Sequence, residues 1–111
     1  MELEANLKLS LLCEMYKNLL TEKQQKMLKD FLDNNLSISE LAVEYNSTRQ
    51  AVNDLLKRTF KTLEGYEQKL KLLAKFESLK EKVSETIKQI ENDSFNKEKI
   101  IANLNKILEV L

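Results

Sequence analysis

The chain has 111 residues, enough for one domain with a modest hydrophobic core, and its lack of proline and single glycine argue against hairpins and sandwiches. Charged residues make up 32% of the sequence, and Leu, Lys and Glu dominate, which favours an all-α protein. The 18 basic and 18 acidic residues cancel, which excludes a generally basic surface for nucleic acid, so any attraction for phosphate must be local.

A first helix is predicted over residues 3–20, where apolar side chains recur mostly at steps of three and four residues. Cys13 is the only cysteine, which excludes an intramolecular disulfide. It lies beside the apolar stripe and the chain has no histidine to activate it, so a packed thiol is favoured over a reactive one.

The acidic start lacks the basic segment of a secretory signal, and no apolar run approaches the roughly 20 residues of a bilayer span, so we expect a cytoplasmic protein.

Two capping boxes predict the starts of the next two helices. Thr21 with Gln24 opens a second helix, which ends at residues 33–35, where asparagines tolerate the left-handed conformation. Its predicted apolar side consists of Met27, Leu28, Phe31 and Leu32. Ser37 with Glu40 opens a short third helix, whose predicted inner face is Ile38, Leu41, Ala42 and Tyr45. The small Ala42 permits a close helix crossing, and Asn46 occupies the turn position where a glycine often stands.

From Thr48 the helical periodicity continues for some forty residues, with a mean step of about 3.5 residues that is typical of a coiled-coil seam. Because globular helices are rarely so long, we expect either a break near Gly65 or Ser78 or a partner for the seam. Residues 92–94 then end this run and cap a last helix. The natural division is a helix-turn-helix module at residues 1–65 and a helical arm at 66–111, best treated together as one domain.

Both arginines of the chain stand within residues 48–58, just after the turn at Asn46. Residues 48–61 hold four basic side chains and one acid, Asp54. Ser47 and Thr48 compete as the N-cap of this helix. If Thr48 is the cap, four residues can reach base edges in a DNA major groove: Thr48, Arg49, Gln50 and Asn53. Three cations one turn further on are candidates for phosphate contact: Lys57, Arg58 and Lys61.

Two interpretations of this surface remain open. In the first it binds DNA, weakly as a monomer and with a strong dependence on salt. In the second it is a solvated helix face that keeps a DNA-binding fold without touching DNA. Asp54 stands in the middle of the surface, where its charge repels the DNA backbone or restricts which bases are accepted.

The apolar stripe from Leu63 to Ile90 also has two interpretations. It folds back on the first two helices of its own chain, or it pairs with a second copy. We favour a homodimer, because the seam offers more apolar surface than one small module can cover and helix-turn-helix proteins usually act in pairs. The predicted dimer contacts are Phe60, Leu63, Tyr66, Leu70, Leu73 and Phe76.

The sequence resembles the YlxM family of small bacterial proteins, which are related to the DNA-binding region 4 of sigma factors. The resemblance rests on Leu20-Thr-Glu-Lys-Gln-Gln25, Leu36-Ser-Ile-Ser-Glu-Leu-Ala42, Thr48-Arg-Gln-Ala-Val52, Lys57-Arg-Thr59, Tyr66-Glu-Gln-Lys-Leu70 and Lys75-Phe-Glu77. It covers roughly residues 7–77. The chain departs from the family's pattern at the turn, where Asn46 and Ser47 replace a glycine and an aliphatic residue.

The resemblance implies a sigma region 4-like helix-turn-helix followed by a long helical C-terminal arm, a homodimer and a regulatory role. Because genes of this family commonly neighbour that of the signal recognition particle GTPase, it also implies a link to that particle. The partner is then DNA, or alternatively the particle's protein or RNA, and a coiled-coil adaptor that binds no DNA is a third possibility. The residues themselves predict no enzyme, cofactor, metal site or small-molecule substrate, since histidine, a phosphate-binding glycine loop and a second cysteine are all missing.

Overall fold

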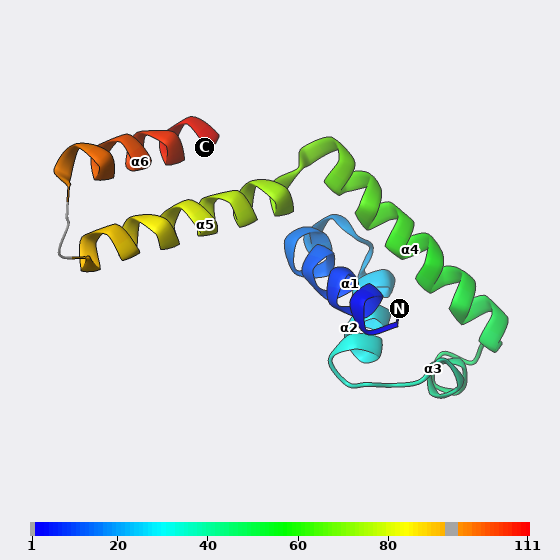
Figure 1. Cartoon of the computed structure of the whole chain (residues 1–111). Helices are drawn as coiled ribbons and strands as arrows, with labels where there is room; N and C mark the ends of the chain where they lie inside the picture. The colour runs from blue at the N-terminus through cyan, green and yellow to red at the C-terminus, as the bar shows by residue number, and fades with distance from the viewer. Residues whose placement is uncertain (1, 93–95) are drawn as a thin grey trace. The chain divides into compact units, whose positions relative to one another are not determined.

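The computed structural model describes residues 2–92 and 96–111, and all the regular structure in these ranges is helical (Figure 1). The helices are α1 (Glu2–Tyr16), η1 (a 3₁₀ turn, Lys17–Leu19), α2 (Glu22–Leu32), α3 (Ile38–Glu44), α4 (Arg49–Leu70), α5 (Leu72–Glu91) and α6 (Lys97–Val110). They form two compact units, unit 1 at residues 1–71 and unit 2 at 72–111. Within the described ranges no helix is both long and apolar enough to cross a membrane. The all-α prediction is confirmed.

The core of unit 1 receives side chains from all four of its α-helices. The buried apolar residues of α1 to α4 are Leu9, Leu12, Tyr16, Met27, Leu28, Leu41, Ala42, Val52, Leu56 and Leu63. They recur at helical spacing, as the sequence predicts for one buried face per helix. Each fully buried leucine stabilises the fold by about 1.5–3 kcal/mol relative to an exposed one. This core fixes the position of α4 against the other helices of unit 1.

Both predicted capping boxes are formed. The hydroxyl of Thr21 accepts from the backbone N–H of Gln24 at 3.2 Å, and the Gln24 side chain accepts from the N–H of Thr21 at 3.0 Å. Ser37 and Glu40 make the same pair of bonds, each at 3.1 Å. Caps of this kind contribute about 1 kcal/mol each to helix stability. They set the first residues of α2 and α3.

The turn between α3 and α4 is closed by the left-handed conformation of Asn46, which has a φ of 49°. The N–H of Ser47 donates to the carbonyl of Ala42 at 2.8 Å, and that of Asn46 donates to Val43 at 3.2 Å. These two bonds form a Schellman motif, in which asparagine takes the place of the usual glycine. The role predicted for Asn46 is confirmed.

A buried carboxylate fastens the end of α3 to α2. Asp30 accepts from the hydroxyl of Tyr45 at 2.9 Å and from the side-chain amide of Asn34 at 3.0 Å. The Lys26 ammonium lies 5.6 Å from the centre of the Tyr45 ring. Burial, together with the hydrogen bond to Asp30, raises the pKa of Tyr45 to about 12. The neutral phenol therefore holds the end of α3, and with it the turn that leads into α4.

The second half of α4 packs against α1, and the break that the sequence predicted near Gly65 or Ser78 falls between these two positions, at Lys71. The Tyr16 hydroxyl donates to Glu67, its ring centroid is 6.0 Å from that of Tyr66, and Lys8 pairs with Glu64 at 3.6 Å. These contacts surround Gly65 and hold its turn helical, although glycine costs about 1 kcal/mol there relative to alanine. The helix ends at Leu70, and its C-cap Lys71 has a left-handed φ of 53° that separates α4 from α5. The division between the units thus falls after Lys71, six residues beyond the predicted position 65.

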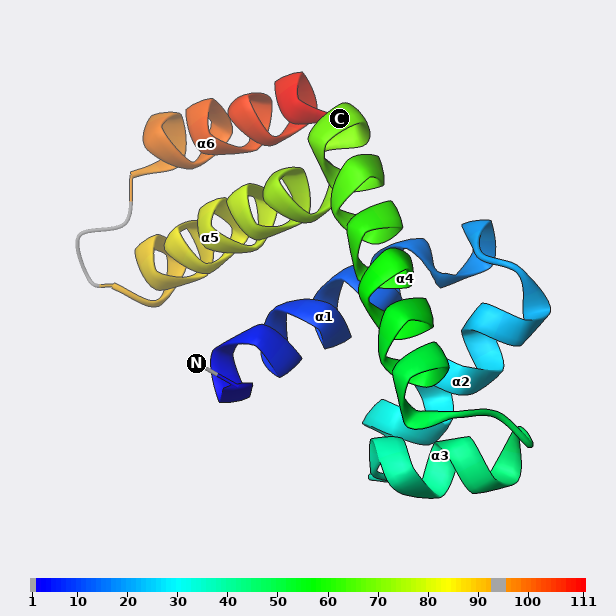
Figure 2. The same cartoon turned by 90° about the vertical axis from the view of Figure 1, so that its right-hand side faces the viewer.

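Unit 2 is a hairpin in which α5 and α6 lie side by side and antiparallel (Figures 1 and 2). Thr86 and Ile100 are buried, and the Asn103 amide donates to Gln89 at 2.7 Å across the pair. Asn96 caps α6 by accepting from two backbone N–H groups, at 2.9 and 3.3 Å. This corrects the cap predicted at residues 92–94, of which 93 and 94 lie outside the described residues. Asn96 fits because its amide oxygen reaches the first free N–H groups of the helix.

Candidate nucleic-acid interface

The candidate interface is the outer face of α4 at its N-terminal half. Figure 2 shows α3 lying across the N-terminal end of α4, joined to it by the turn. Val52, Leu56 and Thr59 are buried and mark the inner side of α4. At 3.6 residues per turn, Gln50, Asp54 and Lys61 lie on the opposite side, and all three are exposed.

Thr48 resolves the competition between the two predicted caps. Its hydroxyl oxygen accepts from the backbone N–H of Ala51 at 3.0 Å, so α4 begins at Arg49. Arg49 and Gln50 are therefore the first two helical residues, and both are exposed. Asn53 is half-buried at the side of the helix. The hydroxyl oxygen of Thr48 is used as the acceptor in this cap, and its O–H can still donate a hydrogen bond.

Gln50 and Asp54 form one polar pair on the outer face. The Gln50 amide nitrogen donates to a carboxylate oxygen of Asp54 at 3.1 Å, one helical turn away. The bond fixes the amide with its oxygen and one N–H still free, which is the pair of groups that can bind adenine. Asp54 was expected from the sequence to repel the DNA backbone or to restrict which bases are accepted, and its pairing with Gln50 was not predicted. The four-residue spacing was the signal for the hydrogen bond.

The cations of α4 divide between its two flanks. Lys57 and Asn53 line a shallow groove of about 190 Å³, together with Asn6, Leu9, Phe31, Ile38, Leu56 and Phe60. Arg58 faces the other flank, where it lines a cleft of about 360 Å³ with Lys23 from α2. Lys61 stays exposed between them, about one turn further along α4. The structure thus places positive charge on both sides of the face that carries Gln50.

The predicted dimer contacts do not share one environment. Leu63 is 0% exposed and belongs to the core, so it has no surface left for a partner. Phe60 and Tyr66 are half-buried in unit 1, and Leu73 is half-buried in unit 2. Leu70 and Phe76 are exposed. Leu63 is therefore withdrawn from the predicted set, because its side chain is already fully packed.

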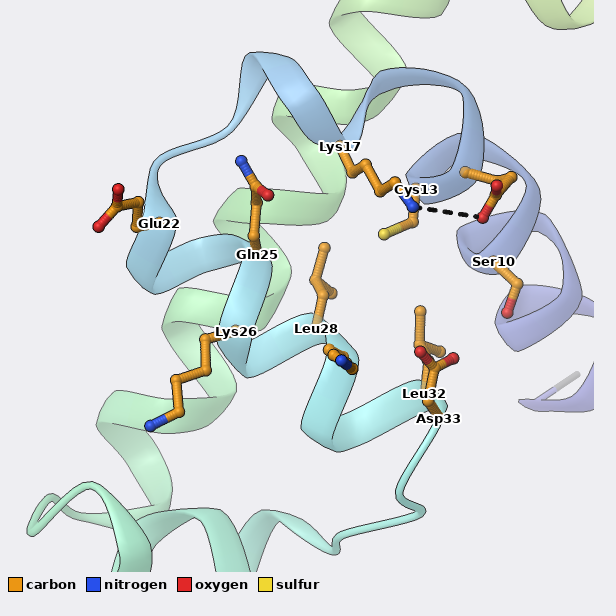
Figure 3. A pocket seen from close by; sticks show the side chains of 11 residues that line it. Ser10, Cys13, Lys17, Glu22, Gln25, Lys26, Leu28, Leu32 and Asp33 are labelled. Carbon is orange, nitrogen blue, oxygen red and sulfur yellow. Dashed lines mark ion pairs between the residues drawn. The ribbon is translucent and has the colours of Figure 1, made fainter.

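A cavity of about 650 Å³ lies between α1 and α2 in unit 1 (Figure 3). Cys13, Leu28 and Leu32 point into it, while its rim carries charges of both signs, with Lys17 and Glu14 paired at 3.8 Å. Burial is the main cause that raises the pKa of the Cys13 thiol, which keeps it protonated at neutral pH. The chain has no histidine to activate it, and the described residues hold no cluster of three or more groups that could bind a metal. We assign this cavity no chemistry.

The arrangement of α3, the Asn46 turn and α4 defines a helix-turn-helix protein. A family model described as "Putative helix-turn-helix protein, YlxM / p13 like" (UPF0122) matches residues 3–107. The chain therefore belongs to the UPF0122 family, as the YlxM-like motifs predicted.

Bacterial relatives share most of the chain's length. A UPF0122 protein of Halalkalibacterium halodurans is 40% identical over 109 residues, covering 98% of this chain and 95% of the relative. A UPF0122 protein of Shouchella clausii is 43% identical over 91 residues, covering 82% of this chain and 84% of the relative. One from Lactococcus lactis subsp. cremoris is 34% identical over 110 residues, covering 99% and 96%. The similarity thus extends through both units.

Proposed function

We propose that this protein is a DNA-binding regulator that places the first turns of α4 in a major groove. The observation that carries the proposal is the Thr48 cap, because it puts Arg49 and Gln50 at the exposed start of the second helix of a helix-turn-helix. This is the position from which such helices contact base edges. Within residues 48–61 the only acid is Asp54, so the local charge also favours a polyanion.

The exposed polar side chains in the first half of α4 are suited to different contacts with DNA. The guanidinium of Arg49 can donate two parallel hydrogen bonds to guanine, and the Gln50 amide can pair with adenine. Asn53 stands at the side of the helix, where it meets a base edge or the sugar-phosphate strand beside it. Lys57, Arg58 and Lys61 neutralise phosphates and fix the register without reading sequence. Thr48 contributes a hydroxyl donor beside Arg49.

Binding by a single copy is expected to be weak, since few cations meet the DNA and the chain has no net charge. We therefore propose a homodimer that presents two α4 helices to two half-sites. Its support is the apolar surface of unit 2, where many large side chains are exposed. They are Leu72, Phe76, Val83, Ile87, Ile90, Ile101, Leu104, Leu108 and Leu111.

The test selects binding duplexes from a randomised pool and measures their affinity by fluorescence anisotropy at low salt. Changing Arg49 and Gln50 together to alanine is expected to weaken binding tenfold or more, because each paired base contact is worth about 1–3 kcal/mol. The matched control changes Gln68 and Lys69 to alanine, an exposed pair near the other end of the same helix. Circular dichroism checks that both variants stay helical. Equal affinities for the two variants, or no selected duplex at all, would contradict the proposal.

The second candidate is a modulator of the signal recognition particle, acting on its protein or its RNA. Family membership supports it through the gene neighbourhood implied by the YlxM resemblance, and no particular side chain does. GTP turnover by the purified particle and its receptor, with and without this protein, separates the two candidates. If GTP turnover is unchanged at a saturating concentration of this protein, the second function is excluded. If a DNA duplex is also selected from the randomised pool, DNA binding is the function that remains.

A further inference from the structure

A cleft beside the helix-turn-helix is lined by residues from α2, from the turn and from the third turn of α4. Lys23 comes from the first turn of α2, Asn46 and Ser47 from the turn, and Arg58 from the third turn of α4. The remaining lining residues are Met27, Tyr45, Ala51, Val52 and Leu55. Two cations therefore line this cleft and no carboxylate does.

Three acids near this cleft are engaged elsewhere or line another cavity, while Glu44 is exposed beside Tyr45 and contributes to its raised pKa. Asp30 is buried behind Tyr45 and accepts hydrogen bonds from Tyr45 and Asn34. Asp54 holds Gln50 on the outer face of α4. Glu22, the neighbour of Lys23, lines the cavity on the other side of α2 instead. Over the described part of the chain, neither Lys23 nor Arg58 forms an ion pair, so the positive charge is not neutralised.

The position of the cleft relative to α4 fits one strand of a duplex. Ala51, Leu55 and Arg58 follow one flank of the helix, while Asn53 and Lys57 follow the other. The outer face with Gln50 lies between the two flanks. A major groove about 12 Å wide that admits a helix has a phosphate strand along each side. A duplex read by Gln50 therefore brings one strand toward the cleft that Lys23 and Arg58 line.

We propose that this cleft binds a backbone phosphate of the DNA, with Lys23 as a contact contributed from outside the helix-turn-helix. The Arg58 guanidinium donates to the phosphate from α4, and Lys23 supplies a compact charge from α2. The side chains of Asn46 and Ser47 add neutral donors from the turn. The Lys26 ammonium, 5.6 Å from the Tyr45 ring centre, adds positive charge behind the site. The proposal rests on the DNA-binding function and names a further residue of it.

Lys29 is the matched control for Lys23. Both are exposed lysines of α2, but Lys29 lines the cavity between α1 and α2, in company with Asp33. A change to glutamine removes one positive charge from the same helix in either case. Only Lys23→Gln removes it from the cleft.

The experiment measures how the affinity for a selected duplex and for its scrambled version depends on salt. Each lost phosphate contact lowers the slope of log K against log salt by about 0.9. Lys23→Gln and Arg58→Gln are each expected to show that decrease, to weaken binding to both duplexes severalfold, and to leave the preference between them unchanged. Lys29→Gln is expected to match the wild type. Equal slopes for Lys23→Gln and Lys29→Gln would overturn the inference.

Neutral methylphosphonate groups placed singly along the selected duplex locate the contact. One position is expected to weaken the wild type more than it weakens Lys23→Gln, because that variant keeps only the Arg58 part of the contact. Additive losses at every position would contradict the assignment, as would a Lys23→Gln effect confined to the selected duplex. If the wild type binds no duplex, the DNA-binding function itself fails, and the inference with it. If the change of Arg49 and Gln50 to alanine weakens DNA binding and Lys23→Gln does not, DNA binding stands and only the inference about Lys23 fails.

Discussion

Units 1 and 2 have similar apolar patterns in sequence but differ in how many of these apolar side chains they bury. In unit 1, four α-helices bury their apolar faces against one another, from Leu12 in α1 to Leu63 in α4. In the described part of unit 2, the two helices bury Thr86 and Ile100, and nine large apolar side chains remain exposed. Two helices cannot cover each other on more than one side, so the hairpin needs further contacts to remove its apolar surface from water. Unit 1 therefore has a core of its own, and the exposed apolar surface of unit 2 is the basis of the proposed homodimer.

Cutting a leucine back to alanine in each unit tests this difference most strongly. Leu12 is fully buried, so Leu12→Ala is expected to lower the free energy of unfolding by about 2–5 kcal/mol. Leu108 is exposed in α6, and Leu108→Ala is expected to cost far less at low protein concentration. Urea unfolding followed by circular dichroism measures both. Similar costs would mean that the two units do not differ as described.

The association of unit 2 is tested by making its surface polar. Changing Ile87 and Leu104 to asparagine is expected to turn a dimer into a monomer in analytical ultracentrifugation, because it removes apolar area from the exposed sides of α5 and α6. The control changes Leu7 and Leu11 to asparagine, which are exposed apolar residues of α1 in unit 1. A wild type that sediments as a monomer at high concentration would remove the dimer proposal. An effect of the control alone would move the interface to unit 1.

Tyr45→Phe is expected to have a smaller effect, confined to unit 1. Losing the hydrogen bond to Asp30 should cost about 1 kcal/mol near neutral pH. The folded pKa of Tyr45 is about 12, above the value near 10 of an unfolded tyrosine. The stability from its neutral form is therefore complete below about pH 10 and is lost as the pH rises from about 10 to 12.

Urea unfolding at a series of alkaline pH values checks the Tyr45 prediction. The wild type is expected to lose its advantage over Tyr45→Phe across that alkaline range. A constant difference between the two proteins from pH 8 to about 12 would show that the Asp30 bond does not set this pKa.

Local features of the fold could be read from the sequence, because their signals lie within a few residues. The capping boxes at Thr21 and Ser37 and the left-handed Asn46 depend only on neighbouring backbone groups. The left-handed residue that ends α4 is Lys71, a residue type that gives no such signal. The contacts that keep Gly65 helical join α1 to α4 across some fifty residues, which periodicity does not reveal.

The candidate site shows the same limit. The exposed start of α4 followed from the helix-turn-helix pattern, and Thr48 was one of two caps that the sequence allowed. Lys23 was not among the predicted residues, because it lines the same cleft as Arg58 only through the packing of α2 against α4. Leu63 was assigned to a dimer surface because a repeating apolar seam does not distinguish a contact within the chain from one between chains.

Amide chemical-shift mapping with a selected duplex shows whether α4 binds DNA with its first turns. The largest shifts are expected from Arg49 to Arg58, with a further group around Lys23. Residues 72–111 are expected to change little, since in this account they associate with a second copy and do not touch DNA. Shifts that concentrate in unit 2 and leave the start of α4 unmoved would show that α4 does not bind DNA with its first turns.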